Sequence, residues 1–165
     1  DGYPMSELDL SHNKLRTLPP KVFDFGENYS GERGDYSDIR VLNLAHNEIS
    51  SLPADAFAGH FYGMLGSLQI LNLSRNALEE LPPSLFHEFK PYLWHARRRK
   101  FRDLRVIDLS YNKLSTLDSE LFNISSLRTL DLRGNPLTKA TRLDLLDPAG
   151  GCFRPHRNCV ELWMD

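Results

Sequence analysis

Apolar and polar residues follow the same short pattern at five places along the chain. The five segments read MSELDLSHNKL, IRVLNLAHNEI, LQILNLSRNAL, LRVIDLSYNKL and LRTLDLRGNPL, and they start near residues 5, 39, 68, 104 and 127. In each, apolar fourth and sixth positions flank a polar fifth position, as a short strand with one buried face requires. Because one such strand cannot bury its apolar face alone, the five strands must stack in a parallel sheet with the return segments behind it.

These segments resemble the leucine-rich repeat pattern LxxLxLxxNxL, and four of them continue as LxxLPxxxF or a close variant. The resemblance runs from Met5 to about Leu137. It implies a single α/β domain over residues 1–165, a solenoid with a parallel concave sheet and irregular or short helical return segments. We expect residues 138–165 to form a C-terminal cap that begins with a short amphipathic helix.

Two residue types recur at fixed places after the strands. An asparagine follows the last buried leucine of each strand, and its amide can satisfy turn backbone groups that stacking leaves unpaired. A phenylalanine follows ten residues later in four repeats, and stacking should place these rings in one aromatic column. Both sets are interpreted as structural. They are Asn13, Asn47, Asn76, Asn112 and Asn135, and Phe23, Phe57, Phe86 and Phe122.

The first and third repeats exceed the roughly 20–29 residues that are usual for this family, so we expect insertions at 24–38 and 87–103. The first insertion holds five acids and one arginine, and the second holds six Lys or Arg, two acids and several aromatic residues. Exposed ion pairs are worth only about 0–1 kcal/mol each, so the basic insertion should stay open rather than pair with the acidic one. It then offers a second protein-binding site. The residues of this site are Tyr92, Trp94, Arg97, Arg98 and Arg99.

Two columns of residues on the concave face are candidates for contact with a protein partner. The eighth positions are His12, His46, Arg75, Tyr111 and Gly134, and the fifth positions are Asp9, Asn43, Asn72, Asp108 and Asp131. Tyr and Arg are frequent at interface hot spots, so Arg75 and Tyr111 are the strongest candidates. The fifth positions could accept donors from a partner, although Asp or Asn is also common there in the family. Asp108, His12 and His46 complete the predicted contact set.

Composition excludes several function classes. Among 165 residues, 20 Lys and Arg against 22 Asp and Glu leave a net charge of −2, without the basic excess of a nucleic-acid-binding protein. Apolar runs fall short of the ~20 residues of a membrane span. Phosphate-binding loops, nucleophile elbows and zinc-protease motifs are missing from the sequence. We therefore expect neither an enzyme nor a cofactor.

Metal binding is also not expected. His12 and His46 should be neighbours, but two solvated imidazoles are the simpler interpretation. Cys152, His156 and Cys159 offer three ligands where a structural zinc site generally has four. A local disulfide or two free thiols are the alternatives for the cysteines.

The remaining signals concern location. Asn-x-Ser sequons begin at Asn28, Asn72 and Asn123; Asn28 and Asn123 are predicted glycosylation sites, whereas the repeat pattern itself explains Asn72. They favour an extracellular or cell-surface receptor or adhesion fragment that binds protein without catalysis. A cytoplasmic scaffold or regulatory subunit is the alternative, since Lys139 and Thr141 stand where extracellular relatives carry cap cysteines and no signal peptide is seen. A third option is an enzyme whose catalytic domain lies outside this sequence.

Overall fold

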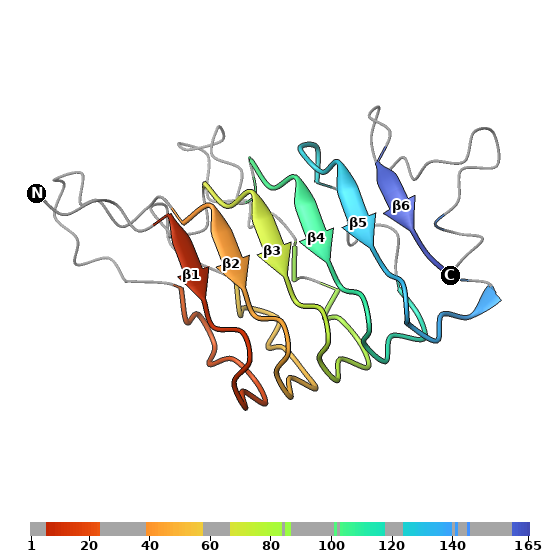
Figure 1. The fold of residues 1–165 in the computed structure, drawn as a ribbon, viewed down its shortest axis with the longest axis horizontal. Helices are drawn as coiled ribbons and strands as arrows, with labels where there is room; N and C mark the ends of the chain where they lie inside the picture. Colours follow the sequence, from red (N-terminus) through yellow and green to blue (C-terminus); the bar gives the residue numbers. More distant parts are fainter. Residues whose placement is uncertain are drawn as a thin grey trace, which may run out of the picture.

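Six three-residue strands form one parallel sheet in the order β1-β2-β3-β4-β5-β6 (Figure 1). The computed structural model describes residues 6–23, 39–57, 67–83, 85–86, 101, 103–117, 124–139, 141, 145 and 160–165. The strands are β1 (Glu7–Asp9), β2 (Val41–Asn43), β3 (Ile70–Asn72), β4 (Val106–Asp108), β5 (Thr129–Asp131) and β6 (Glu161–Trp163). Each strand comes from one repeat up to β5, which confirms the predicted solenoid with a parallel sheet.

The register places equivalent repeat positions side by side. Leu8 pairs with Leu42, which pairs with Leu71, and the row continues through the neighbouring strands. The central residues of β2 to β5 are fully shielded from solvent, as are the leucines that follow two residues later. Burying a side chain of this size stabilises the fold by roughly 1.5–3 kcal/mol relative to leaving it exposed. The stacked leucine rows are therefore the main source of stability.

Aromatic rings form a second row in the return segments. Phe23 stacks on Phe57 with ring centres 6.0 Å apart, and Phe57 stacks on Phe86 at 6.4 Å. Phe101 then meets Phe86 edge-on at 5.6 Å and is buried. The basic insertion predicted at 87–103 includes Phe101, but this residue belongs to the core. Phe122 lies outside the described residues.

The sheet has one more strand than the repeats predict. β6 pairs with β5, so that Leu130 faces Leu162 and Asp131 faces Trp163. Within the predicted cap, Lys139, Thr141 and Leu145 have helical backbone, and β6 follows them. Leu162 packs against the core while Trp163 is exposed. β6 thus has the two-residue alternation of a strand without the leucine pattern or the asparagine of a repeat.

Candidate functional site

The asparagine side chains join neighbouring repeats. Nδ2 of Asn112 donates to the carbonyls of Leu109 and Ser110 in its own repeat, at 3.0 and 3.4 Å, and to that of Leu73 in the preceding repeat, at 3.0 Å. Its Oδ1 accepts the backbone N–H of Leu78, also in the preceding repeat, at 3.0 Å. Asn47, Asn76 and Asn135 bond in the same way, and none of the buried side-chain nitrogens and oxygens in the described part of the chain lacks a partner. This ladder holds the turns that follow the strands.

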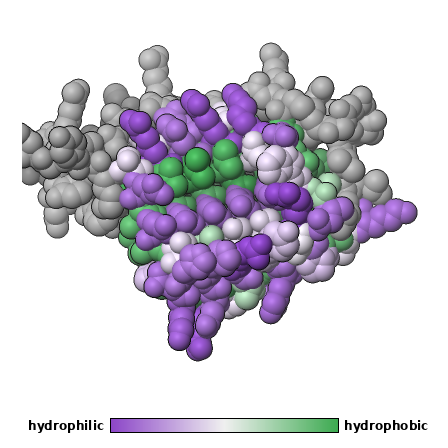
Figure 2. Space-filling model, viewed as in Figure 1, coloured by the Kyte–Doolittle hydropathy of each residue, from purple (hydrophilic) through white to green (hydrophobic). Residues whose placement is uncertain are grey.

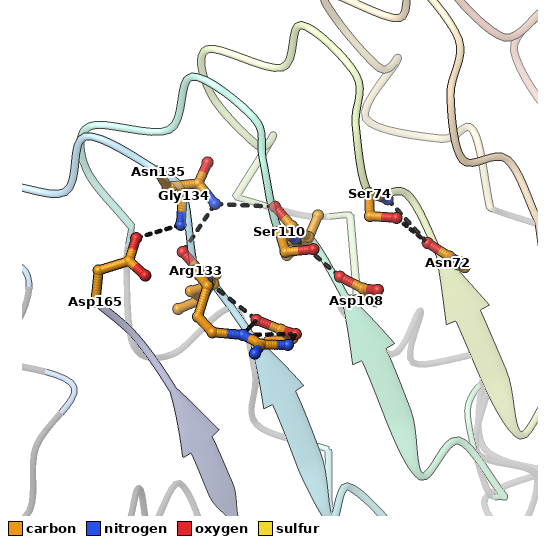
Figure 3. A network of polar contacts seen from close by, with 11 residues as sticks. Asn72, Ser74, Asp108, Ser110, Arg133, Gly134, Asn135 and Asp165 are labelled. Carbon is orange, nitrogen blue, oxygen red and sulfur yellow. Dashed lines mark hydrogen bonds and ion pairs between the residues drawn. The ribbon is translucent and has the colours of Figure 1, made fainter.

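The fifth-position side chains also have an internal partner. Each accepts, through Oδ1, the backbone N–H two residues further on, at 2.8–3.2 Å. The acceptors are Asp9, Asn43, Asn72, Asp108 and Asp131. These are Asx turns, in which a short polar side chain replaces a backbone acceptor where the strand ends. Figure 3 shows Asn72 and Asp108 bonded in this way to Ser74 and Ser110. Asp108 therefore accepts a hydrogen bond within its own turn, and a contact with a partner would add to this bond.

The eighth positions, which we call the turn row, all have a left-handed backbone. The φ angles of His12, His46, Arg75 and Tyr111 are 54–55°, and that of Gly134 is 69°. The backbone N–H of each non-glycine member donates to a carbonyl of the next repeat, at 2.7–3.0 Å. The N–H of Gly134 donates to the Asp165 carboxylate instead (Figure 3). The four side chains of the row thus leave turns of the same backbone conformation.

Fixed turns bring the side chains of the row into contact. The imidazole rings of His12 and His46 stack with centres 4.2 Å apart and planes 15° apart. The guanidinium carbon of Arg75 lies 4.5 Å from the centre of the Tyr111 ring, a cation–π arrangement. A Cβ added at Gly134 would lie 2.5 Å from Cδ1 of Tyr111, so this ring occupies the space above the glycine. The predicted contact residues Arg75 and Tyr111 are therefore one packed unit.

A second arginine, Arg133, lies two residues after the end of β5 and directly before Gly134 of the turn row. The Arg133 guanidinium bonds both oxygens of the Asp131 carboxylate, the shortest contact being 2.6 Å, and lies 4.6 Å from the centre of the Trp163 ring. The hydrogen bond to Asp131 raises the pKa of Arg133 further above its usual value. Sequence reasoning missed Arg133 and Trp163, because the seventh position is small in the other repeats and β6 was not predicted.

Two further groups on this side of the sheet have shifted pKa values. The pKa of the Asp9 carboxyl is lowered, first by the Ser11 side chain and then by the Ser11 backbone, which both hydrogen-bond it. The pKa of the His46 imidazole is lowered, mainly because stacking removes water from it and then because His12 and Arg75 lie near. Asp9 thus keeps its negative charge, and His46 tends to stay neutral.

Exposed apolar side chains lie on the sheet face that carries the third and fifth positions, which we call the open face. Among the described residues, the large hydrophobic side chains classed as exposed are Ile70, Tyr111 and Trp163, at 37%, 51% and 40%. Ile70 and Trp163 belong to the open face, because their neighbours Leu71 and Leu162 point into the core. Tyr111 borders this face in the turn row. Figure 2 shows apolar side chains over the upper parts of the strands, with hydrophilic side chains above and below them.

Several predicted sites cannot be placed. Tyr92, Trp94 and Arg97 to Arg99 lie outside the described residues, as do both predicted glycosylation sites and the two cysteines. Within the described ranges, no three His, Cys, Asp or Glu side chains come together as a metal site would require. The same part of the chain contains no helix with the length and apolar character of a membrane span.

Known proteins with similar sequences and structures are repeat proteins. The Leucine Rich Repeat family model matches residues 5–25, 38–60 and 67–89, and a second Leucine rich repeat model matches residues 92–137. Tsukushi of Mus musculus is 27% identical over 135 residues, which are 81% of this chain and 30% of Tsukushi. A solved leucine-rich repeat protein of Leptospira interrogans is 26% identical and has a TM-score of 0.56 over 84% of this chain and 28% of that chain. The chain spans less than a third of either relative, and it belongs to the leucine-rich repeat family.

Proposed function

We propose that this leucine-rich repeat domain is a noncatalytic scaffold that binds a protein through its open face and turn row. The observation that carries the proposal is the placement of Ile70, Tyr111 and Trp163, the exposed large apolar side chains of the described residues. Partly exposed aromatic residues beside arginines are the types that dominate binding energy at protein interfaces. Apolar side chains gathered on one face mark interaction sites more often than singly scattered ones do.

Arg75 and Tyr111 are the main contacts in this proposal. Tyr111 is held between the Arg75 guanidinium and Gly134, so its ring loses little conformational freedom when a partner binds. A residue ordered before binding contributes more of its contact energy to affinity. His12, His46 and Asp108 extend the contact surface across the neighbouring repeats. The basic insertion, with Tyr92, Trp94 and Arg97 to Arg99, is a second proposed site outside the described residues.

We further propose that the domain belongs to a receptor or adhesion protein at the cell surface. The sequons at Asn28 and Asn123 support an extracellular location, since glycans are added to this motif in secreted proteins. Secretion of the chain from mammalian cells behind a heterologous leader tests this. Glycans on Asn28 and Asn123 that an amidase removes are expected. A secreted chain without glycans would favour the cytoplasmic scaffold or regulatory subunit.

Binding through the open face is tested with two matched arginine substitutions. Ile70→Arg places a charge in the apolar part of the open face, whereas Thr116→Arg places the same charge on an exposed residue of the return segment after β4. Proteins captured from extracellular extracts on the wild-type domain are purified and measured directly. We expect a partner whose affinity falls about tenfold or more with Ile70→Arg and stays unchanged with Thr116→Arg. Equal affinities for the two variants would contradict the proposal.

A further inference from the structure

We propose that Arg75 and the His12–His46 pair bind a carboxylate of the protein partner, and that the histidine pair takes up a proton as it binds. The inference rests on the proposed function, because it assumes a protein bound at the open face. The partner supplies the carboxylate of an aspartate, a glutamate or a chain terminus. This carboxylate lies opposite His12, His46 and Arg75.

Arg133 and Arg75 are both exposed and both stack on an aromatic ring. Arg133 is neutralised by Asp131 in its own repeat, with three hydrogen bonds of 2.6–3.2 Å. Within the described part of the chain, Arg75 forms no ion pair and no side-chain hydrogen bond, and its guanidinium lies against the Tyr111 ring. A guanidinium has five N–H donors in a planar fork that matches a carboxylate. The Arg75 guanidinium is thus positioned by the Tyr111 ring, and its N–H groups donate to no acceptor among the described residues.

The fifth positions of the second and third repeats leave the positive charge of Arg75 uncancelled, which favours an anion there. The third and second repeats carry the neutral amides Asn72 and Asn43 where the fourth and fifth repeats carry Asp108 and Asp131. The oxygen Oδ1 of each amide is already bonded to its own Asx turn. A carboxylate from outside therefore meets no negative side chain of the fifth position between Asp9 and Asp108, and the positive charge of Arg75 is not cancelled there.

The histidine pair lies next to Arg75 and can respond to an anion. Its rings are 4.2 Å apart, so double protonation of the free pair places two positive charges close together, with Arg75 as a third. The charged side chains that act on the pair are Asp9 of β1, which interacts with His12, and Arg75, which interacts with His46. An added carboxylate offsets the repulsion and favours the protonated form.

This balance of charges fits a single carboxylate better than a sulfated polysaccharide. The fixed charge of the row is that of one arginine, Arg75, and Asp9 and Asp108 lie at fifth positions on either side of it. A polyanion requires a continuous field of fixed cations, whereas one carboxylate needs a single guanidinium and its neighbours. A glutamate side chain also stays ionised at pH 5.5, because its ordinary pKa is about 4.3.

The experiment uses the whole 165-residue chain and an acetylated, amidated peptide with three glutamates. A matched peptide with three glutamines is the uncharged control. Titrations followed by NMR at pH 7.5 and 5.5 give the dissociation constants for the wild type, Arg75→Gln and Lys113→Gln. Lys113 is an exposed cation two residues after Tyr111, outside the row, so its loss changes the net charge equally. Melting curves confirm that each variant is folded.

We expect the glutamate peptide to bind and the glutamine peptide not to bind. Arg75→Gln should weaken binding about tenfold or more, the effect of losing charge-assisted hydrogen bonds, while Lys113→Gln should have little effect. Binding should be tighter at pH 5.5 than at pH 7.5, and the double variant His12→Gln with His46→Gln should remove this difference. The signals of His12 and His46 should shift on binding.

Three results would overturn the inference. These are equal binding of the two peptides, equal effects of Arg75→Gln and Lys113→Gln, and a sulfated heparin oligosaccharide that binds far more tightly than the glutamate peptide through Arg75. The last result would assign the row to a glycan. The proposed open-face function is tested with Ile70→Arg against the captured partner, whereas this inference is tested with Arg75→Gln against the two peptides. Failure of the proposed open-face function and failure of this inference are therefore seen in different variants.

Discussion

The first and fourth repeats have the same sequence pattern but different surroundings. Among the described strands, β1 pairs with β2 alone, whereas β4 lies between β3 and β5. Leu10 is half-buried, while its counterpart Leu109 is fully buried. Among the described residues, Asn13 bonds only carbonyls of its own repeat, whereas Asn112 is buried and bonds two repeats. The comparison shows that a repeat motif gains most of its energetic value from its neighbours.

The largest expected difference concerns the leucines. Leu109→Ala should lower the free energy of unfolding by about 2–5 kcal/mol, because it leaves a cavity between packed repeats. Leu10→Ala should have less than half of that effect, since its site is partly hydrated in the native state. Urea denaturation measures both. A loss below about 0.5 kcal/mol for Leu109→Ala, the size of an ordinary surface change, would contradict the packing of the fourth repeat.

The asparagines should differ in the same direction. Asn112→Ala should cost about 1–3 kcal/mol, because it leaves buried backbone groups of two repeats without partners. Asn13→Ala should stay within about 0.5 kcal/mol, since its bonds are exposed and can be replaced by water. Urea denaturation of the two variants in parallel checks the prediction. Equal effects would mean that the bonds between repeats add nothing to stability.

Adding a methyl group at Gly134 and shortening the side chain at His12 should have different effects on stability. Gly134→Ala should destabilise the domain by about 1–2 kcal/mol, because alanine is strained at this φ of 69° and its Cβ would displace the Tyr111 ring of the fourth repeat. His12→Ala in the first repeat should change stability by less than about 0.5 kcal/mol, since a Cβ is already accommodated there. Thermal melts distinguish the two, and the NMR signals of the Tyr111 ring report its displacement.

The smallest effect is the pH dependence of the second repeat. The pKa of His46 in the folded chain is lower than its ordinary value of 6.5, so the unfolded chain binds this proton first as the pH falls. Stability from this group is therefore complete above about pH 6.5 and declines as the pH falls through the folded pKa. His46→Gln should reduce the change in melting temperature between pH 7.5 and pH 5.5. An unchanged profile in the variant would show that the stack does not shift this pKa.

The repeat pattern predicts the parallel sheet, because leucine spacing reports strand alternation and asparagine spacing reports the turn. It also predicts that the eighth-position residues of neighbouring repeats lie side by side. The sequence reasoning did not identify the left-handed turn, although Gly134 shares its position with Tyr111 and Arg75. Contacts such as Arg133 on Trp163 could not be predicted, because they need a strand, β6, whose sequence lacks the repeat pattern. The burial of Phe101 could not be predicted, because this residue resembles its aromatic neighbours of the basic insertion in sequence.

The asparagine ladder has a consequence for how the solenoid opens. Each asparagine from the second repeat on accepts one backbone N–H of the repeat before it, so every junction between repeats has its own amide. The four amides belong to Leu15, Ile49, Leu78 and Leu114. If the domain unfolds as one unit, all four should exchange their hydrogens with solvent at the same protection; if it opens from an end, protection should change step by step along the chain. The hydrogen-exchange rates of these four amides thus distinguish unfolding of the whole domain from stepwise opening from one end.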